Sequence, residues 1–299
     1  MRQDRPSRSA IGAMFLRAAL THSPHTSIFA DPYAERLLPW PLGSLSRQPL
    51  ISRGATFGMR HSTIMRALTI VLLRARYTED RLVERMAQGV RQYVILGAGW
   101  DSFVLRRPDL VTQLDVFEVD HPATQRSKRA RLAELGFQLP DNVHFVPVDF
   151  EQQALSAALR TAGLNPTQAT LVCWQGVTYY LTPAALQDTF GQLATCCDAE
   201  LDVIFDYLDA RYFKHRQAQH RASWLNLGLR IGGERFLSGF DPAQLDTVLA
   251  PLGYQVVEQL LGTQLANFWP AAEMGSLKPR SLVHFAHVRK PAGTAITPA

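Results

Sequence analysis

Residues 92–120 constrain the fold of this chain more than any other stretch. The stretch opens with an apolar run, passes through a Gly-Ala-Gly turn at 97–99, and ends in a second apolar run that carries Glu118 and Asp120. An apolar run without alternation is typical of a strand that is buried on both faces of a parallel sheet. Glycine lets a ligand approach the backbone closely, and an acid roughly 20 residues later is placed to bind ribose hydroxyls. The stretch therefore predicts half of a nucleoside-binding site in an α/β fold.

The residues after the turn separate two classes of nucleotide cofactor. A dinucleotide site usually has the pattern G-x-G-x-x-G, followed by a helix whose amino end faces the pyrophosphate. Here Ser102 occupies the third glycine position, and Trp100 and Asp101 follow the turn directly. A carboxylate at this place would repel a diphosphate, whereas a cofactor with a positive centre and no phosphate would suit it. S-adenosylmethionine has these properties, and a nicotinamide cofactor is the alternative.

The composition is ordinary for a soluble globular enzyme, with 46% hydrophobic and 19% charged residues among 299. The net charge of +5 comes from 31 basic and 26 acidic residues, and the basic ones are spread along the chain, so nucleic-acid binding is not required. The cysteines Cys173, Cys196 and Cys197 have no CxxC spacing, which indicates a reducing cytoplasm and no zinc. We expect a small-molecule partner, no metal, no nucleic acid and no membrane.

From Tyr93 onward, strands and helices alternate in the pattern of a doubly wound sheet. The connection 209–240 between the fifth and sixth strands is long enough to predict a lid over a site. We divide the chain into a helical cap at 1–90, an α/β core at 91–290 and a disordered tail at 291–299. The predicted strands span 93–96, 116–119, 144–148, 170–174, 201–207, 254–258 and 282–288, and the predicted helices between them lie near 122–135, 153–162, 183–196 and 242–252.

The amino-terminal part reads as helices joined by loops. Apolar residues at helical spacing predict helices over 10–20, 59–73 and 76–88. The segment 39–54 holds three prolines and two glycines and is predicted to be a loop. Asp31 precedes a proline at a helix start, which favours the role of a helix N-cap.

Six short motifs occur together in the order found in one family. They are FADPYA at 29–34, RAR at 74–76 with ED at 79–80, VILGAGWDS at 94–102, FEVDHP at 117–122, VDF at 148–150 and QGVTYYL at 175–181. On these motifs the chain resembles the leucine carboxyl methyltransferase family, which includes the enzyme that methylates the terminal carboxylate of a protein phosphatase and bacterial enzymes that methylate oxygen atoms of polyketides. The resemblance covers about 17–207 and implies a Rossmann-like class I methyltransferase fold. In that fold a seven-stranded, mostly parallel sheet ends in an antiparallel strand, and amino-terminal helices fold over the cofactor.

The resemblance also implies which residues bind S-adenosylmethionine. Asp120 would take the ribose hydroxyls, and Glu118 is the second candidate because it lies on the same strand face. Arg74 would hold the methionine carboxylate with its two-donor fork. The family often has glutamate where this chain has Gln175, and Trp100 replaces a smaller aliphatic residue. The full expected cofactor set is Arg17, Arg74, Gly97, Ala98, Gly99, Asp101, Glu118, Asp120, Asp149, Phe150 and Gln175, with Asp149 and Phe150 reading adenine.

The expected reaction is methyl transfer to an oxygen of a small molecule, with a natural product favoured. A carboxylate acceptor is already ionised and needs no general base, whereas a phenol or alcohol would be helped by one. The candidates for that base are Tyr179, His61, His215 and His220, and Arg211 or Arg221 in the lid could hold an acidic group of the acceptor. A protein carboxyl terminus as acceptor, a dehydrogenase, and a cofactor-binding protein without turnover are the alternatives; Gln175 favours the last.

Overall fold

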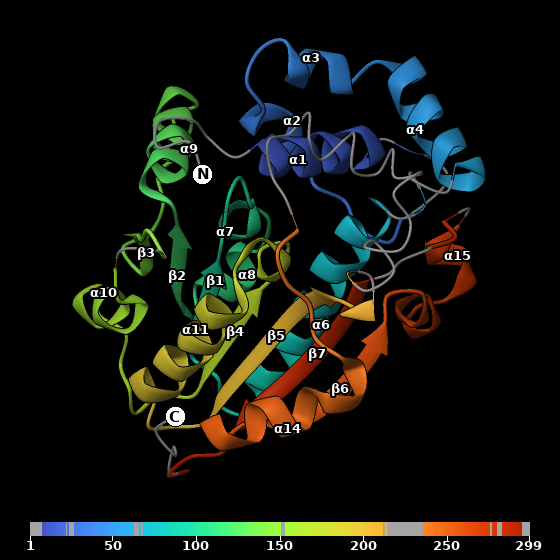
Figure 1. Cartoon of the computed structure of the whole chain (residues 1–299). Helices are drawn as coiled ribbons and strands as arrows, with labels where there is room; N and C mark the ends of the chain where they lie inside the picture. The colour runs from blue at the N-terminus through green and yellow to red at the C-terminus, as the bar shows by residue number, and fades with distance from the viewer. Residues whose placement is uncertain are drawn as a thin grey trace.

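The computed structural model describes residues 8–21, 23, 27–62, 66, 68–150, 153–211, 213, 236–275, 277–279 and 283–294. A seven-stranded sheet in the order β3-β2-β1-β4-β5-β7-β6 lies at its centre, with helices on both faces (Figure 1). β7 is antiparallel to both neighbours, and the other pairs are parallel. This confirms the predicted fold class. The strands are β1 (Gln92–Leu96), β2 (Asp115–Asp120), β3 (Val143–Pro147), β4 (Thr170–Trp174), β5 (Leu201–Leu208), β6 (Gln255–Leu261) and β7 (Val283–Lys290).

β1 lies at the point where the strand order reverses, because β2 and β3 continue to one side of it and β4 and β5 to the other. Every residue of β1, β4 and β5 is buried, which is why their apolar runs lack alternation. Ligands of open α/β sheets bind at the carboxyl ends of the strands beside such a reversal. The topology therefore places the candidate site over the ends of β1, β2 and β4.

The two faces of the sheet carry separate apolar cores. Tyr93 and Ile95 of β1 belong to the core under α6 (Ile70–Ala87), whereas Val94 and Leu96 belong to the core under α11 (Pro183–Cys196). This follows from the two-residue period of a strand. The other helices of the sheet are α7 (Phe103–Arg106), α8 (Pro108–Val111), α9 (Pro122–Glu134), α10 (Leu155–Thr161), α14 (Leu245–Leu249) and α15 (Ala271–Met274), with 3₁₀ turns η1 (Thr178–Tyr180), η2 (Pro242–Gln244), η3 (Ala250–Leu252) and η4 (Gln264–Phe268).

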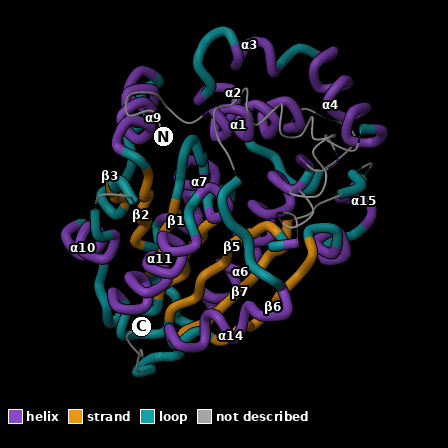
Figure 2. The backbone as a smooth tube through the Cα atoms, viewed as in Figure 1, coloured by secondary structure: helices purple, strands orange, loops and turns teal. Residues whose placement is uncertain are grey.

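Four amino-terminal helices lie beyond the carboxyl ends of the strands (Figures 1 and 2). They are α1 (Arg8–Thr21), α2 (Ala34–Leu37), α3 (Leu42–Ser46) and α4 (Pro49–His61). The predicted loop over 39–54 was wrong, because it contains α3 and the start of α4. Pro49 stands in the first turn of α4, where a proline needs no partner for its nitrogen and favours the helix.

The predicted boundary between the second and third helices was also wrong. α4 ends at His61, and α6 runs from Ile70 through 74–76 without a break. Its buried residues Leu72, Leu73 and Tyr77 continue one helical face across that segment, so the helix does not end there.

The insertion after β5 leaves and re-enters the fold at neighbouring points. The N–H of Ala210 donates to the carbonyl oxygen of Phe240 at 2.9 Å, and the N–H of Leu237 donates to that of Tyr179 at 2.7 Å. The interior of the predicted lid, with His215, His220 and Arg221, lies outside the described residues. Among the described helices, none combines the length and the apolar character needed to span a bilayer.

Candidate active site

The glycine turn after β1 is enclosed on two sides. Gly97 and Gly99 both have positive φ, of 70° and 52°. A Cβ on Gly97 would lie 2.2 Å from Cγ2 of Val177, and one on Gly99 would lie 3.0 Å from Cβ of Ala10 in α1. The turn requires glycine at 97 for conformation and for space, and at 99 for conformation above all. Its neighbours are the segment after β4 and the first amino-terminal helix.

Asp120 at the end of β2 binds this turn directly. Its Oδ2 accepts a hydrogen bond from the N–H of Gly99 at 2.5 Å, and its Oδ1 accepts one from the N–H of His121 at 2.6 Å. Burial raises the pKa of Asp120, although these two hydrogen bonds and the charge of Lys128 oppose that effect. The predicted ribose acid and the predicted glycine turn therefore form one unit at the edge of the sheet.

Glu118 lies on the same strand face but has a cationic partner that sequence reasoning missed. Its Oε2 accepts from Nζ of Lys128 in α9 at 2.5 Å, and both side chains are almost completely buried. Burial raises the pKa of Glu118, while Lys128 opposes this. Among the described residues, Oε1 of Glu118 has no hydrogen-bond partner. Lys128 compensates the buried charge, and contact of Glu118 with a ribose stays a prediction.

Asp149 and Phe150 follow the end of β3, next to the end of β2. Oδ2 of Asp149 lies 3.8 Å from Nε2 of His121, and its backbone N–H donates to Oε1 of Gln153 at 3.0 Å. Phe150 packs against the core under α11. The structure thus brings the predicted adenine pair close to the residue after Asp120, and its role in reading adenine stays a prediction.

Arg74 reaches from α6 to the end of β5. Its Nη1 donates to Oδ2 of Asp206 at 3.0 Å, and Oδ1 of Asp206 accepts from the N–H of Gly176 at 2.6 Å. Gly176 has a φ of 76°, and a Cβ there would lie 2.8 Å from both Nη atoms of Arg74. Burial lowers the pKa of Arg74, but Asp206 and Tyr179 raise it by more. The guanidinium is therefore fixed across the turn after β4 and remains charged.

Sequence reasoning missed Asp206, although a signal was present. It is a fully buried acid within the apolar strand β5, and a buried acid needs a partner. Gln175 also takes part in this junction, because its Nε2 donates to the carbonyl oxygen of Arg74 at 3.1 Å and to the hydroxyl of Thr78. An ionised glutamate has no proton to donate to these oxygens. This gives a structural reason for glutamine at that position.

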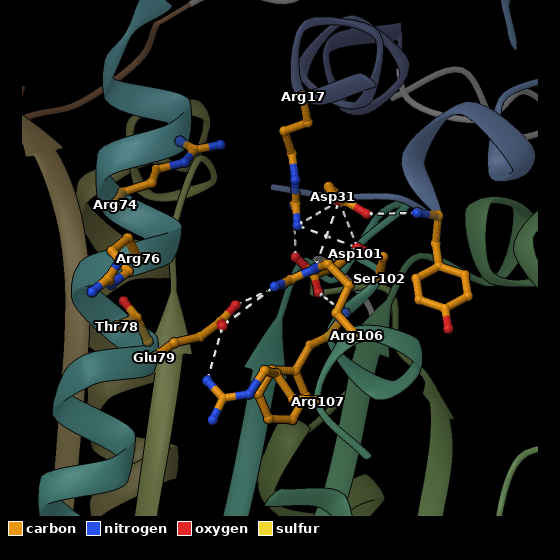
Figure 3. A network of polar contacts seen from close by, with 12 residues as sticks. Arg17, Asp31, Arg74, Arg76, Thr78, Glu79, Asp101, Ser102, Arg106 and Arg107 are labelled. Carbon is orange, nitrogen blue, oxygen red and sulfur yellow. Dashed lines mark hydrogen bonds and ion pairs between the residues drawn. The ribbon is translucent and has the colours of Figure 1, made fainter. Parts of the chain in front are cut away.

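A second polar network holds α1 over the β1 turn (Figure 3). Arg17 binds Oδ2 of Asp31 and Oδ2 of Asp101, both at 2.9 Å. Asp31 also accepts from the N–H groups of Tyr33 and Ala34, at 3.3 and 3.0 Å, which confirms its predicted capping role. The same carboxylate therefore caps a helix and pairs with a buried arginine. Direct contact of Arg17 or Asp101 with a cofactor stays a prediction.

The network continues from the β1 turn to α6. Ser102 donates to Oδ2 of Asp31 at 2.6 Å and accepts from Nε of Arg106 at 2.9 Å. Arg106 in turn binds Glu79 of α6 at 2.6 Å. The ring of Phe29 lies 4.9 Å from the guanidinium of Arg17 and 4.4 Å from that of Arg106. Residues that sequence reasoning treated as separate motifs thus form one connected cluster.

The residues predicted to act on or hold the methyl acceptor lie only partly near the glycine turn and the Arg74–Asp206 pair. Tyr179 lies directly after the Gly176 turn, with its ring 4.8 Å from that of Tyr180 and 5.1 Å from that of Phe236. The side chain of Arg211 is 71% exposed and binds Asp209 at 2.6 Å at the base of the insertion. The ring of His61 stacks at 4.5 Å on that of Phe57, on the exposed side of α4. Of these, Tyr179 is next to the Arg74 junction.

Comparison with known proteins places this geometry in a family. The family model for leucine carboxyl methyltransferase matches residues 10–194. YktD of Bacillus subtilis (strain 168), named as an S-adenosyl-L-methionine-dependent methyltransferase, is 31% identical over 219 residues, which cover 73% of this chain and 72% of YktD. The chain belongs to the leucine carboxyl methyltransferase family.

Two further matches are similar over most of this chain. A protein of Mycobacterium avium (strain 104) with the same kind of name is 29% identical over 273 residues, or 85% of each chain. Among solved structures, an O-methyltransferase family protein from Burkholderia thailandensis has a TM-score of 0.46 at 15% identity, over 85% of this chain and 68% of that one.

The site fits the cofactor of the family. Asp101 and Asp120 place two carboxylates beside the glycine turn, which disfavours a diphosphate and suits a cofactor with a positive centre. The chain is therefore an S-adenosylmethionine-dependent methyltransferase, and the dehydrogenase alternative is excluded. Contact of Arg74, Gly97, Gly99 and Asp120 with that cofactor stays a prediction.

Proposed function

We propose that this methyltransferase acts on an oxygen atom of a small acidic molecule, with a carboxylate as the acceptor. The observation that carries the proposal is the packing of Tyr179, a candidate base, against the rings of Tyr180 and Phe236 beside the turn that holds Arg74. Burial and the charge of Asp206 raise the pKa of Tyr179 well above its usual value. Its hydroxyl stays protonated at neutral pH and does not accept a proton from an alcohol. An acceptor that is already ionised needs no such step.

The remaining demands on the protein are positioning and exclusion of water. S-adenosylmethionine supplies a methyl group on a sulfonium centre that is already activated for transfer. The rings of Tyr179, Tyr180 and Phe236 form an aromatic cluster beside the turn that holds Arg74. Aromatic side chains exclude water and can fix the orientation of an acceptor. The family description, leucine carboxyl methyltransferase, supports a carboxyl acceptor as well.

The test uses the chemical stability of the product. The protein is incubated with methyl-labelled S-adenosylmethionine and separate panels of carboxylic acids, phenols, alcohols and amines. A methyl ester releases labelled methanol in alkali, whereas methyl ethers and methylamines do not. We expect alkali-labile label with one or more acids and none with Asp120→Ala. Label that is stable to alkali, formed with a phenol or alcohol, would contradict the carboxylate proposal and direct attention to His215 and His220 as bases.

A further inference from the structure

The positive charge of this chain is concentrated in one segment. Between Glu35 and Glu79, residues 36–78 contain seven arginines and no lysine, aspartate or glutamate. The rest of the chain has 24 basic and 26 acidic residues, so the whole net charge of +5 arises in this segment. Basic residues are spread along the sequence, as noted above, but acidic ones are missing here. Arg74 pairs with Asp206, and Arg76 pairs with Asp80 and Glu273, so the arginines of this segment that can meet an anionic partner are the exposed ones.

The same segment exposes large apolar side chains. Trp40 is 85% exposed, Leu50 79% and Phe57 66%, and Leu45 and Leu68 are also exposed. These are five of the nine large hydrophobic side chains that are exposed in the described part of the chain. Single exposed apolar residues are normal on a protein surface, but their concentration on one segment is not.

Charge and apolar side chains share one stripe of α4. Leu50, Arg53, Phe57 and Arg60 follow each other at helical spacing, and all four are exposed. The buried residues of the helix are Ser52, Thr56 and Met59, which alternate with the exposed stripe around the helix. In Figure 1, α3 and α4 form the outermost layer above α1. The stripe therefore lies on an exposed side of α4.

Arg53 and Arg60 of this stripe are available to an external anion, unlike two other arginines of the segment. Arg47 binds Glu35 at 3.1 Å, and Arg66 donates to the carbonyl oxygen of Lys278 at 2.8 Å. By contrast, Arg53 and Arg60 form no ion pair with any described residue. A stripe that alternates leucine or phenylalanine with free arginine matches the side chains that settle at a lipid headgroup layer.

We propose that the surface formed by α3 and α4, with Trp40, Leu50, Arg53, Phe57 and Arg60, docks on an anionic lipid membrane. The apolar side chains would enter the boundary of the acyl layer, and the arginines would bind phosphate groups. A nucleic acid would use the arginines but not the outward-facing leucine and phenylalanine. This proposal revises the expectation of no membrane partner, which rested on the lack of a spanning segment.

Vesicle flotation tests the proposal with the full-length protein. We expect binding to vesicles of phosphatidylglycerol mixed with phosphatidylcholine and little binding to phosphatidylcholine alone. The double variants Arg53→Glu/Arg60→Glu and Leu50→Ser/Phe57→Ser should each lower the partition coefficient about tenfold or more. The matched controls are Arg160→Glu on α10 and Val257→Ser on β6, which remove an exposed arginine and an exposed apolar side chain elsewhere.

Fluorescence and assembly state give independent readouts. Of the other four tryptophans, Trp100, Trp174 and Trp269 are buried and Trp224 lies outside the described residues, so only a blue shift on vesicle addition that Trp40→Phe abolishes would place Trp40 in the lipid. Equal vesicle binding by the stripe variants and their controls, or none by the wild type, would overturn the proposal. So would a concentration-dependent dimer that Leu50→Ser/Phe57→Ser dissolves, because the surface would then be an interface between two copies. S-adenosylhomocysteine binding should be unchanged in these variants, which separates this test from that of the methyl acceptor.

Discussion

Asp206 on β5 fixes Arg74 on α6, and the two residues are 132 positions apart in the chain. One oxygen of the Asp206 carboxylate lies 3.0 Å from Nη1 of Arg74, and the other accepts the N–H of Gly176 at 2.6 Å. The guanidinium is thus oriented before any ligand arrives. Preorganisation of this kind lowers the entropic cost of binding an anionic group.

Removal of the Asp206 charge should destabilise the fold and increase the rise in Tm that S-adenosylhomocysteine causes. In Asp206→Asn, Arg74 becomes a buried cation without its partner, and we expect a loss of about 3 kcal/mol in the free energy of unfolding. If Arg74 binds the methionine carboxylate, S-adenosylhomocysteine restores a counter-charge, so it should raise the Tm of the variant by more than that of the wild type. Urea unfolding and thermal melts with and without ligand measure both effects.

Asp202 provides the matched control, because it is another fully buried acid on β5. It binds Nε of Arg85 at 2.8 Å and the ring of His287 at 2.6 Å, away from the glycine turn. Asp202→Asn should also destabilise the fold but leave the ligand-induced shift in Tm unchanged. Equal shifts in the two variants would show that Arg74 does not anchor the cofactor carboxylate.

Gly97→Ala should be more costly than an ordinary glycine substitution. The positive φ costs about 1–2 kcal/mol, and the contact with Val177 adds about 1–3 kcal/mol. Gly136→Ala reports the conformational cost alone, since a Cβ there meets nothing within 4 Å at a φ of +72°, close to the +70° of Gly97. Val177→Ala in the Gly97→Ala background should recover the steric part, as measured by urea unfolding. No recovery would mean that Val177 is not the limiting contact.

Glu118 and Asp120 of β2 should have separable roles. Glu118→Gln leaves Lys128 buried without its counter-charge and should cost about 3 kcal/mol of stability, and an unchanged cofactor affinity would show that Glu118 does not contact the ribose. Asp120→Asn should instead weaken S-adenosylhomocysteine binding about tenfold, with a smaller effect on stability. Calorimetric titration of each variant measures the affinity for S-adenosylhomocysteine, and urea unfolding measures the stability. A similar loss of affinity in both would support the prediction that Glu118 also contacts the ribose.

The raised pKa of Asp120 predicts a pH dependence in the ligand-free protein. A carboxyl whose folded pKa lies above its unfolded value binds its proton more tightly when folded. Its contribution to stability is present below the unfolded pKa, about 3.9, and is lost as pH rises through the folded pKa. The stability of Asp120→Asn relative to wild type should therefore increase over that window and then level off. A flat difference in urea unfolding across the window would contradict the effect.

Asp31 should contribute both as a cap and as a counter-charge. Asp31→Asn keeps an oxygen for the N–H of Ala34 but removes the charge that faces Arg17, so we expect a loss of about 3 kcal/mol. Asp31→Ala should cost about 1 kcal/mol more, because the cap is also lost. Urea unfolding measures both. Equal losses in the two variants would show that capping contributes nothing.

The sequence alone identified what local patterns encode. The buried runs of β1 and β4, the glycine turn and the acid of β2 follow from side-chain period and backbone freedom, which neighbouring residues determine. The ordered motifs also identified the family correctly. The same local rules failed in two places. Over 39–54 the composition indicated a loop, but a proline begins α4 there. At 74–76 the pattern indicated a break between two helices, but buried contacts continue α6 through this segment.

Tertiary structure decided which charges meet. Lys128 on Glu118, Asp206 on Arg74, and Arg17 between Asp31 and Asp101 join residues from separate elements. A buried charge requires a partner, but the sequence does not specify which of many distant charges will be adjacent. The concentration of arginine in 36–78 is a property of the sequence. Only the fold decides that Leu50 and Phe57 stay exposed, because Ser52, Thr56 and Met59 are the residues of α4 that it buries.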